Sequence, residues 1–136
     1  MWQWMWKFKV PHRIWMFIWL LLHGKLLTNA TRFHRHMTTD PHCMTCETTI
    51  EGSEHILRRC PSARQVWTSL KDKKMDYLQD DLDFTEWFFH HARGVHEDAN
   101  WATKFIITLW YIWKWRCTAQ FNTTEEIPFD KGEFLL

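Results

Sequence analysis

Three cysteines and one histidine between residues 43 and 60 follow the spacing C-x2-C-x8-H-x4-C, which constrains the fold more than any other feature of the chain. Zinc takes four sulfur or nitrogen ligands in a tetrahedron, and a C-x2-C turn supplies two thiolates from one tight loop. Cys43 and Cys46 form that pair, and His55 and Cys60 complete the set. The spacing predicts one structural zinc ion, because four protein ligands leave no open coordination position.

His55 and Cys60 lie five residues apart, and on an ideal helix such residues point about 140° away from each other. Pro61 removes this objection, because the residue before a proline is held away from the helical region of backbone space. We therefore expect a short helix from Glu54 to end at Arg59, so that Cys60 turns back toward the metal.

Other interpretations of these residues stay open. Cys43 and Cys46 could be a redox pair or simply reduced thiols, although a thioredoxin-like site needs a βαβ context and the surroundings here are loop and helix. Cys117 falls far away inside a predicted helix and is expected to be a buried thiol rather than a ligand. Three histidines that flank the cluster are expected to face solvent, His42 being the best substitute ligand among them: His34, His36 and His42.

The chain is long enough for one compact domain or two very small units, since it has 136 residues of which 46% are hydrophobic. Its helical apolar spacing predicts a mainly α fold, in which a small zinc-stabilised helical module precedes a helical unit with one long helix. Helices are expected over residues 12–24, 29–36, 54–59, 61–70, 85–92 and 99–121, the first of them ending or kinking at Gly24. The expected organisation is a zinc-binding domain (1–70), a polar linker (71–83), a helical connector (84–121) and a flexible tail (122–136).

No segment is expected to cross a membrane. The longest apolar runs, residues 14–22 and 105–113, have nine residues each, about half of the roughly 20 that a bilayer requires. No small-residue cleavage site follows residues 14–22, which argues against a signal peptide. These features predict an intracellular protein, without deciding between nucleus and cytoplasm.

The order of several motifs, rather than the zinc spacing alone, resembles a known family. The reverse-transcriptase zinc-binding domain of plant LINE-type (non-LTR) retrotransposon polyproteins is similar to residues 2–67. The motifs that carry the resemblance are Trp4-x-Trp6-Lys7, Val10-Pro11-His12-x-Ile14-x-x-Phe17-x-Trp19, His23-Gly24-Lys25-Leu26-x-Thr28, the four zinc residues with Glu47-Thr48, His55-Ile56-Leu57-x-x-Cys60, and Val66-Trp67. Residues 101–121 resemble the helical connector that often follows this domain, with Cys117 where an asparagine is expected.

The resemblance implies a zinc module from a mobile element, associated with nucleic acid and not itself an enzyme. It implies Zn²⁺ as the cofactor, with Cys43, Cys46, His55 and Cys60 as its ligands. It also implies a fragment of a longer polyprotein, whose polymerase and ribonuclease H domains would lie before and after these residues. Consistent with this, the chain has no phosphate-cradling glycine loop, no G-x-S-x-G and no H-E-x-x-H motif.

Two hypotheses for function follow. Residues 1–60 carry eight basic and four acidic side chains, against nine and twelve in residues 61–136, so a surface that contacts RNA or DNA is expected in the first half. Such binding would be weak and salt-dependent. The candidate contacts, for which solvated surface charge is the alternative, are Lys25, Arg32, Arg35, Arg58 and Arg59.

The second hypothesis is a structural or protein-interaction module that packs against polymerase or ribonuclease H domains without binding nucleic acid. Eleven tryptophans exceed what a core of this size requires, so part of the aromatic surface is expected to be an interface. The tryptophans expected there are Trp2, Trp4, Trp6, Trp110, Trp113 and Trp115.

Overall fold

A computed structural model describes residues 10–70, 82–92 and 101–121 of the chain. The described residues confirm the mainly helical fold, with one isolated β-bridge, between His42 and Ile50, in place of a sheet. The elements are α1 (His12–Leu22), α2 (Asn29–His34), the π-helical turn η2 (His55–Arg59), α3 (Pro61–Ser69), α4 (Phe84–Ala92) and α5 (Trp101–Phe121). Residues 1–9, which include Trp2, Trp4 and Trp6, most of the linker and the tail lie outside the described residues, so the domain boundaries stay a prediction.

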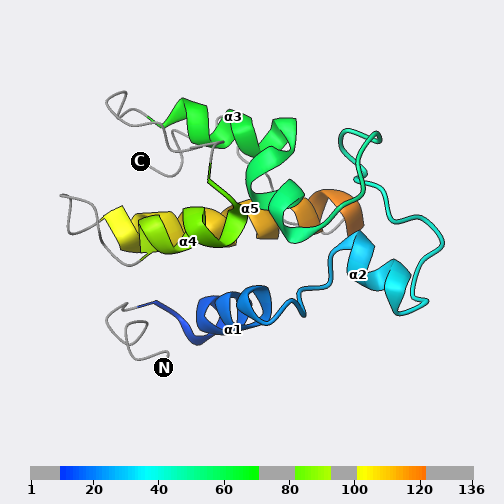
Figure 1. Cartoon of the computed structure of the whole chain (residues 1–136), viewed down its shortest axis with the longest axis horizontal. Helices are drawn as coiled ribbons and strands as arrows, with labels where there is room; N and C mark the ends of the chain where they lie inside the picture. Colours follow the sequence, from blue (N-terminus) through cyan, green and yellow to red (C-terminus); the bar gives the residue numbers. More distant parts are fainter. Residues whose placement is uncertain (1–9, 71–81, 93–100, 122–136) are drawn as a thin grey trace.

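The long helix α5 organises the packing, because it contacts α4, η2 and α1 (Figure 1). Trp67 of α3 joins these elements: its ring centroid lies 5.5 Å from that of Trp87 in α4 and 5.5 Å from that of Phe105 in α5. The Trp67 indole N–H also donates to the backbone oxygen of Leu57 at 2.8 Å, so this buried ring keeps its polar atom satisfied. Helices that sequence analysis assigns to two units thus share one hydrophobic core.

Helix α1 begins at His12, as the sequence predicts, and ends at Leu22, two residues before the expected end at Gly24. Its apolar stripe is buried, and Pro11 precedes its first residue. Gly24 adopts a φ of +66°, a left-handed conformation that costs glycine little and terminates many helices. The backbone N–H of Lys25 then donates to the oxygen of Leu20 at 2.8 Å, which folds the chain back over the end of α1.

Thr28 caps α2, and replacing it by alanine is expected to lower the free energy of unfolding by about 1 kcal/mol. Its side-chain oxygen accepts a hydrogen bond from the backbone N–H of Thr31 at 3.2 Å, satisfying a donor that the helix leaves unpaired. Urea unfolding followed by circular dichroism measures the change. Thr68→Ala, at an exposed threonine of α3, is the control and should change stability by less than about 0.5 kcal/mol. Equal effects of the two substitutions would contradict the capping role.

The expected tryptophan interface on α5 is only partly present. Trp115 is 5% exposed and belongs to the core. Trp110 and Trp113 are half-buried, because both rings pack against Phe17 of α1, with centroid distances of 5.6 and 6.3 Å. The expectation of an unpartnered face is therefore wrong for Trp115, whereas Trp110 and Trp113 keep part of their surface exposed beside α1. Cys117 is half-buried rather than fully buried.

None of the helices in the described part of the chain is both long and apolar enough to span a membrane.

Candidate metal centre

Residues 41–51, here called the cysteine loop, are closed at their base by backbone hydrogen bonds. The N–H of Cys43 donates to the oxygen of Thr49 at 2.8 Å, and that of Glu51 donates to the oxygen of Pro41 at 2.9 Å. Inside the loop, the N–H of Glu47 donates to the oxygen of Cys43 at 2.9 Å, which closes the turn that carries Cys43 and Cys46. This arrangement holds both sulfurs on one side of a short loop.

The other two candidate ligands flank η2. The N–H of Cys60 donates to the oxygen of His55 at 2.6 Å, an i to i+5 bond that defines a π-helical turn. Such a turn is wider than an α-helical one, so it brings the fifth residue back toward the first. Cys60 itself is extended, with φ −59° and ψ 137°, as its position before Pro61 requires. The predicted helix end at Arg59 is confirmed, whereas the π-helical form was not predicted.

The loop and η2 bring the four side chains of Cys43, Cys46, His55 and Cys60 together, with their ligand atoms all within 4.8 Å of one another. The sulfurs of Cys43 and Cys60 are 3.8 Å apart, and the Cys46 sulfur is 3.3 Å from Nε2 of His55. A tetrahedral zinc with Zn–S bonds of about 2.3 Å separates two sulfurs by about 3.8 Å, and a sulfur from a nitrogen by about 3.6 Å. The donor set and its spacing therefore fit Zn²⁺.

Electrostatics at the cluster favour a cation. The backbone N–H of Thr48 donates to Cys46 and is the main reason that the pKa of Cys46 is lowered to about 6. Burial raises the pKa of Cys60 to about 11, and the neighbouring sulfurs of Cys43 and Cys46 add to the increase. Three adjacent thiols cannot all ionise unless a positive charge compensates them, and a divalent metal supplies that charge.

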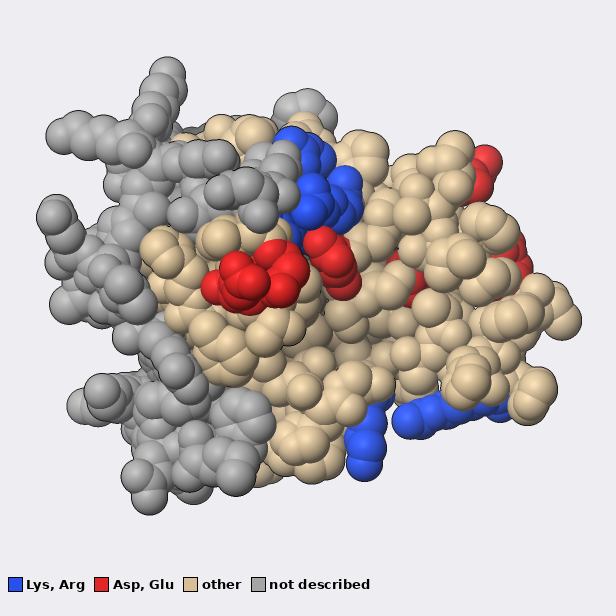
Figure 2. Space-filling model, in the orientation of Figure 1, with Lys and Arg blue, Asp and Glu red and all other residues tan. Residues whose placement is uncertain are grey.

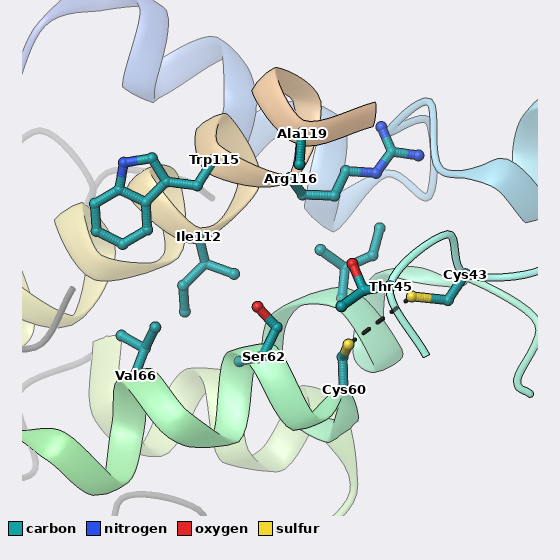
Figure 3. Close-up of a pocket in the computed structure, with 11 residues that line it drawn as sticks. Cys43, Thr45, Cys60, Ser62, Val66, Ile112, Trp115, Arg116 and Ala119 are labelled. Carbon is teal, nitrogen blue, oxygen red and sulfur yellow. Dashed lines mark hydrogen bonds between the residues drawn. The ribbon is translucent and has the colours of Figure 1, made fainter. Parts of the chain in front are cut away.

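The cluster is shielded from solvent on the side of α5. Cys43, Cys60 and His55 are buried, and Cys46 is half-buried. Figure 3 shows the sulfurs of Cys43 and Cys60 facing each other. Both residues line a crevice of about 60 Å³. Side chains from α3 and α5 line its walls, among them Val66, Ile112, Trp115 and Arg116. Pockets that bind small-molecule ligands measure roughly 300–1,000 Å³, so this crevice is too small for a substrate of that size.

The flanking histidines lie outside the cluster. His34, His36 and His42 are exposed, and the four clustered residues do not include them. His42 is turned toward Asp40, with Nδ1 2.9 Å from a carboxylate oxygen. Hydrogen bonds from the backbone and ring of His42 hold the pKa of Asp40 below its usual value.

The candidate nucleic-acid contacts differ in exposure. Lys25 and Arg35 are exposed, and Arg32 is half-buried. Arg59 is exposed but pairs with Glu54 at 3.1 Å. Arg58 has no exposed surface and lies over the Trp87 ring, 5.1 Å from its centroid, so its expected contact with phosphate does not fit the structure. Positive charge alone does not predict exposure here, because Arg58 lies on the side of η2 that faces the core.

A buried polar network beside the cysteine loop was not foreseen. Glu51, 1% exposed, forms an ion pair with Arg116 of α5, and Nε of Arg116 donates to the second carboxylate oxygen at 3.1 Å. The backbone N–H of Asn29 donates to the same carboxylate at 2.8 Å. The side chain of Asn29 in turn donates to the oxygen of His42 at 2.9 Å and accepts from Arg116 at 3.1 Å.

This network ties the start of α2 and both ends of the cysteine loop to α5. Burial opposes the charge of Arg116, but the hydrogen bonds and charge of Glu51 outweigh it and raise the pKa of Arg116. Glu51 and Arg116 lie 65 residues apart, so no local sequence pattern links them. Arg116 lies within residues 101–121, which resemble the helical connector, and this resemblance was the only indication in the sequence that the arginine has a role.

Comparisons with known proteins identify a zinc-binding domain in this chain. A family model described as zinc-binding in reverse transcriptase matches residues 1–67. The chain is 30% identical over 115 residues to an Arabidopsis thaliana protein named "Putative ribonuclease H protein", an alignment that covers 83% of this chain and 18% of that protein. The chain therefore spans less than a fifth of the length of this relative. Solved structures include none that matches the chain.

Proposed function

Residues 1–67 belong to the reverse-transcriptase zinc-binding family, and from this premise we propose that Cys43, Cys46, His55 and Cys60 hold one structural zinc ion. The observation that carries the proposal is the convergence of four sulfur and nitrogen atoms within 4.8 Å. Four protein ligands fill the tetrahedron, so the metal has no position for water or substrate. Its function is to fix the cysteine loop against η2, and the module itself is not catalytic.

The zinc module assists nucleic-acid binding within a longer retrotransposon-type protein. Residues 1–60 have a formal charge of +4, which becomes +3 when three thiolates and one Zn²⁺ add −1. A charge of this size supports a few phosphate contacts, so binding is weak and depends strongly on salt. The basic first half of the chain supports this part of the proposal.

A second candidate function is packing against polymerase or ribonuclease H domains of the longer protein. Exposed apolar side chains on the cysteine loop favour it, since Met44 is 59% and Ile50 56% exposed. Zinc-dependent folding without a salt-sensitive affinity for RNA or DNA would favour this second function over the first.

Elemental mass spectrometry of purified protein tests the zinc proposal. We expect one zinc per chain in the natural protein and none in the Cys43→Ser/Cys46→Ser double variant. Cys117→Ser is the matched control and should retain the metal, because Cys117 lies outside the cluster. Folded protein with no zinc above background would overturn the ligand assignment.

A further inference from the structure

The segment that contains α1 and α2 carries basic side chains and no acidic ones. The chain has no aspartate or glutamate before Asp40. Arg59 and Arg116, by contrast, form ion pairs with Glu54 and Glu51. Within the described residues, Lys25 and Arg35 form no ion pair, so both charges are available to an anionic partner. Figure 2 shows basic side chains along the edge where α1 and α2 lie, apart from the acidic groups on the same face.

Aromatic rings are exposed among these cations. Trp19 is 41% exposed, its ring stacks on that of His23 with the centroids 4.1 Å apart, and Nζ of Lys25 lies 5.5 Å from its centroid. Phe33 is 48% exposed and lies in α2 between Arg32 and Arg35, the residue that follows the helix. Exposed aromatic rings beside cations offer surfaces on which an unstacked base can stack. We call the surface formed by Trp19, Lys25, Arg32, Phe33 and Arg35 the α1–α2 edge.

The α1–α2 edge is held in place by the rest of the fold. The left-handed Gly24 directs Lys25 back over the end of α1. Asn29, the first residue of α2, is fixed by Glu51 and Arg116 in the buried network. A surface that is already ordered loses less conformational entropy when a ligand binds.

We propose that the α1–α2 edge binds single-stranded nucleic acid, with phosphates at Lys25, Arg32 and Arg35 and unstacked bases against Phe33 and Trp19. Interleaved cations and exposed aromatic rings suit a single strand, because its bases are free to stack on side chains. A duplex keeps its bases stacked inside and would leave these rings without partners. The inference rests on the proposed nucleic-acid function and assigns it to one surface and one class of ligand.

Fluorescence anisotropy with a short labelled single-stranded RNA, a DNA strand of the same sequence and the matching DNA duplex tests the proposal. We expect the natural zinc-loaded protein to prefer the single strands. Phe33→Ala should weaken single-strand binding at least about fivefold, because a base loses its stacking partner. Lys25→Gln/Arg35→Gln should make the slope of log affinity against log salt less negative by about 1.4, since each phosphate contact contributes about 0.7.

The matched control is Arg64→Gln/Lys104→Gln, which removes two positive charges from α3 and α5 at residues that are not among the candidate contacts. It should bind as the natural protein does, and circular dichroism should show equal helicity in all variants. If the α1–α2 edge variants bind like the natural protein, the assignment to this surface fails while nucleic-acid binding stands. If the natural protein binds none of the three probes, the proposed nucleic-acid function fails as well. Preference for the duplex, or for anionic vesicles over RNA and DNA, would overturn the single-strand inference.

Discussion

Removal of zinc by a chelator is expected to unfold the cysteine loop and η2 and to reduce the helicity of the protein. Structural zinc contributes an apparent binding free energy of about 10–16 kcal/mol in zinc-finger peptides, which is comparable to the entire stability of a small domain. Without the ion, Cys43, Cys46 and Cys60 remain as adjacent thiols held by weak sulfur hydrogen bonds. Trp67, which reports on the core beside η2, should then become more solvent-exposed.

Circular dichroism and tryptophan emission during titration with chelator measure this transition. We expect helicity to fall and the emission to move to longer wavelength, with recovery when zinc is added back. Cys117→Ser should behave as the natural protein does, whereas the Cys43→Ser/Cys46→Ser variant should not respond to the chelator. Acidification should act in the same direction, because protons compete with zinc for the thiolates. Unchanged helicity and thermal midpoint after complete zinc removal would show that the metal is not structural.

The parts of the fold that sequence analysis predicted are those specified by neighbouring residues. Pro61 begins α3 through sterics within one turn, so its effect is visible in the sequence. The same holds for the end of η2 at Arg59, which depends only on the proline two residues later. The convergence of the four cluster residues also followed from spacing, because two of them share one tight turn.

The features that escaped prediction depend on elements far apart in the chain. The burial of Arg58 depends on α4, which supplies Trp87 beneath its guanidinium. The packing of Trp110 and Trp113 depends on Phe17, more than ninety residues earlier in the sequence. The π-helical form of η2 accommodates about one more residue per turn than an α-helix does. The five-residue spacing of His55 and Cys60 was the only indication of it in the sequence. Helical periodicity alone cannot identify which surface another helix will cover.

Replacement of Arg116 by methionine is expected to lower the free energy of unfolding by about 3–5 kcal/mol, the usual cost of removing one partner from a buried ion pair. Methionine keeps much of the apolar stem, so the main loss is the charge that compensates Glu51. That carboxylate is 1% exposed and would retain only the hydrogen bond from the backbone N–H of Asn29 among those described above. Urea unfolding of the zinc-loaded protein measures the change.

Two comparisons distinguish the loss of the ion pair from a general effect of substituting a residue of α5. Lys104→Met, at an exposed position of the same helix, should change stability by less than about 0.5 kcal/mol. Glu51→Gln/Arg116→Met should be more stable than Arg116→Met alone, because the glutamine leaves no buried charge behind. If Arg116→Met were as stable as Lys104→Met, the ion pair would not hold the cysteine loop to α5.

The same substitution should also weaken zinc binding, although Arg116 is not among the candidate ligands. The N–H of Glu51 closes the base of the cysteine loop on Pro41, and its side chain is anchored by Arg116. Loss of that anchor lets the loop adopt more conformations before zinc binds, and ordering it then costs free energy. Competition with a chromophoric chelator should therefore show a lower zinc affinity for Arg116→Met than for Lys104→Met. Equal affinities would mean that α5 stabilises the core without helping to shape the metal centre.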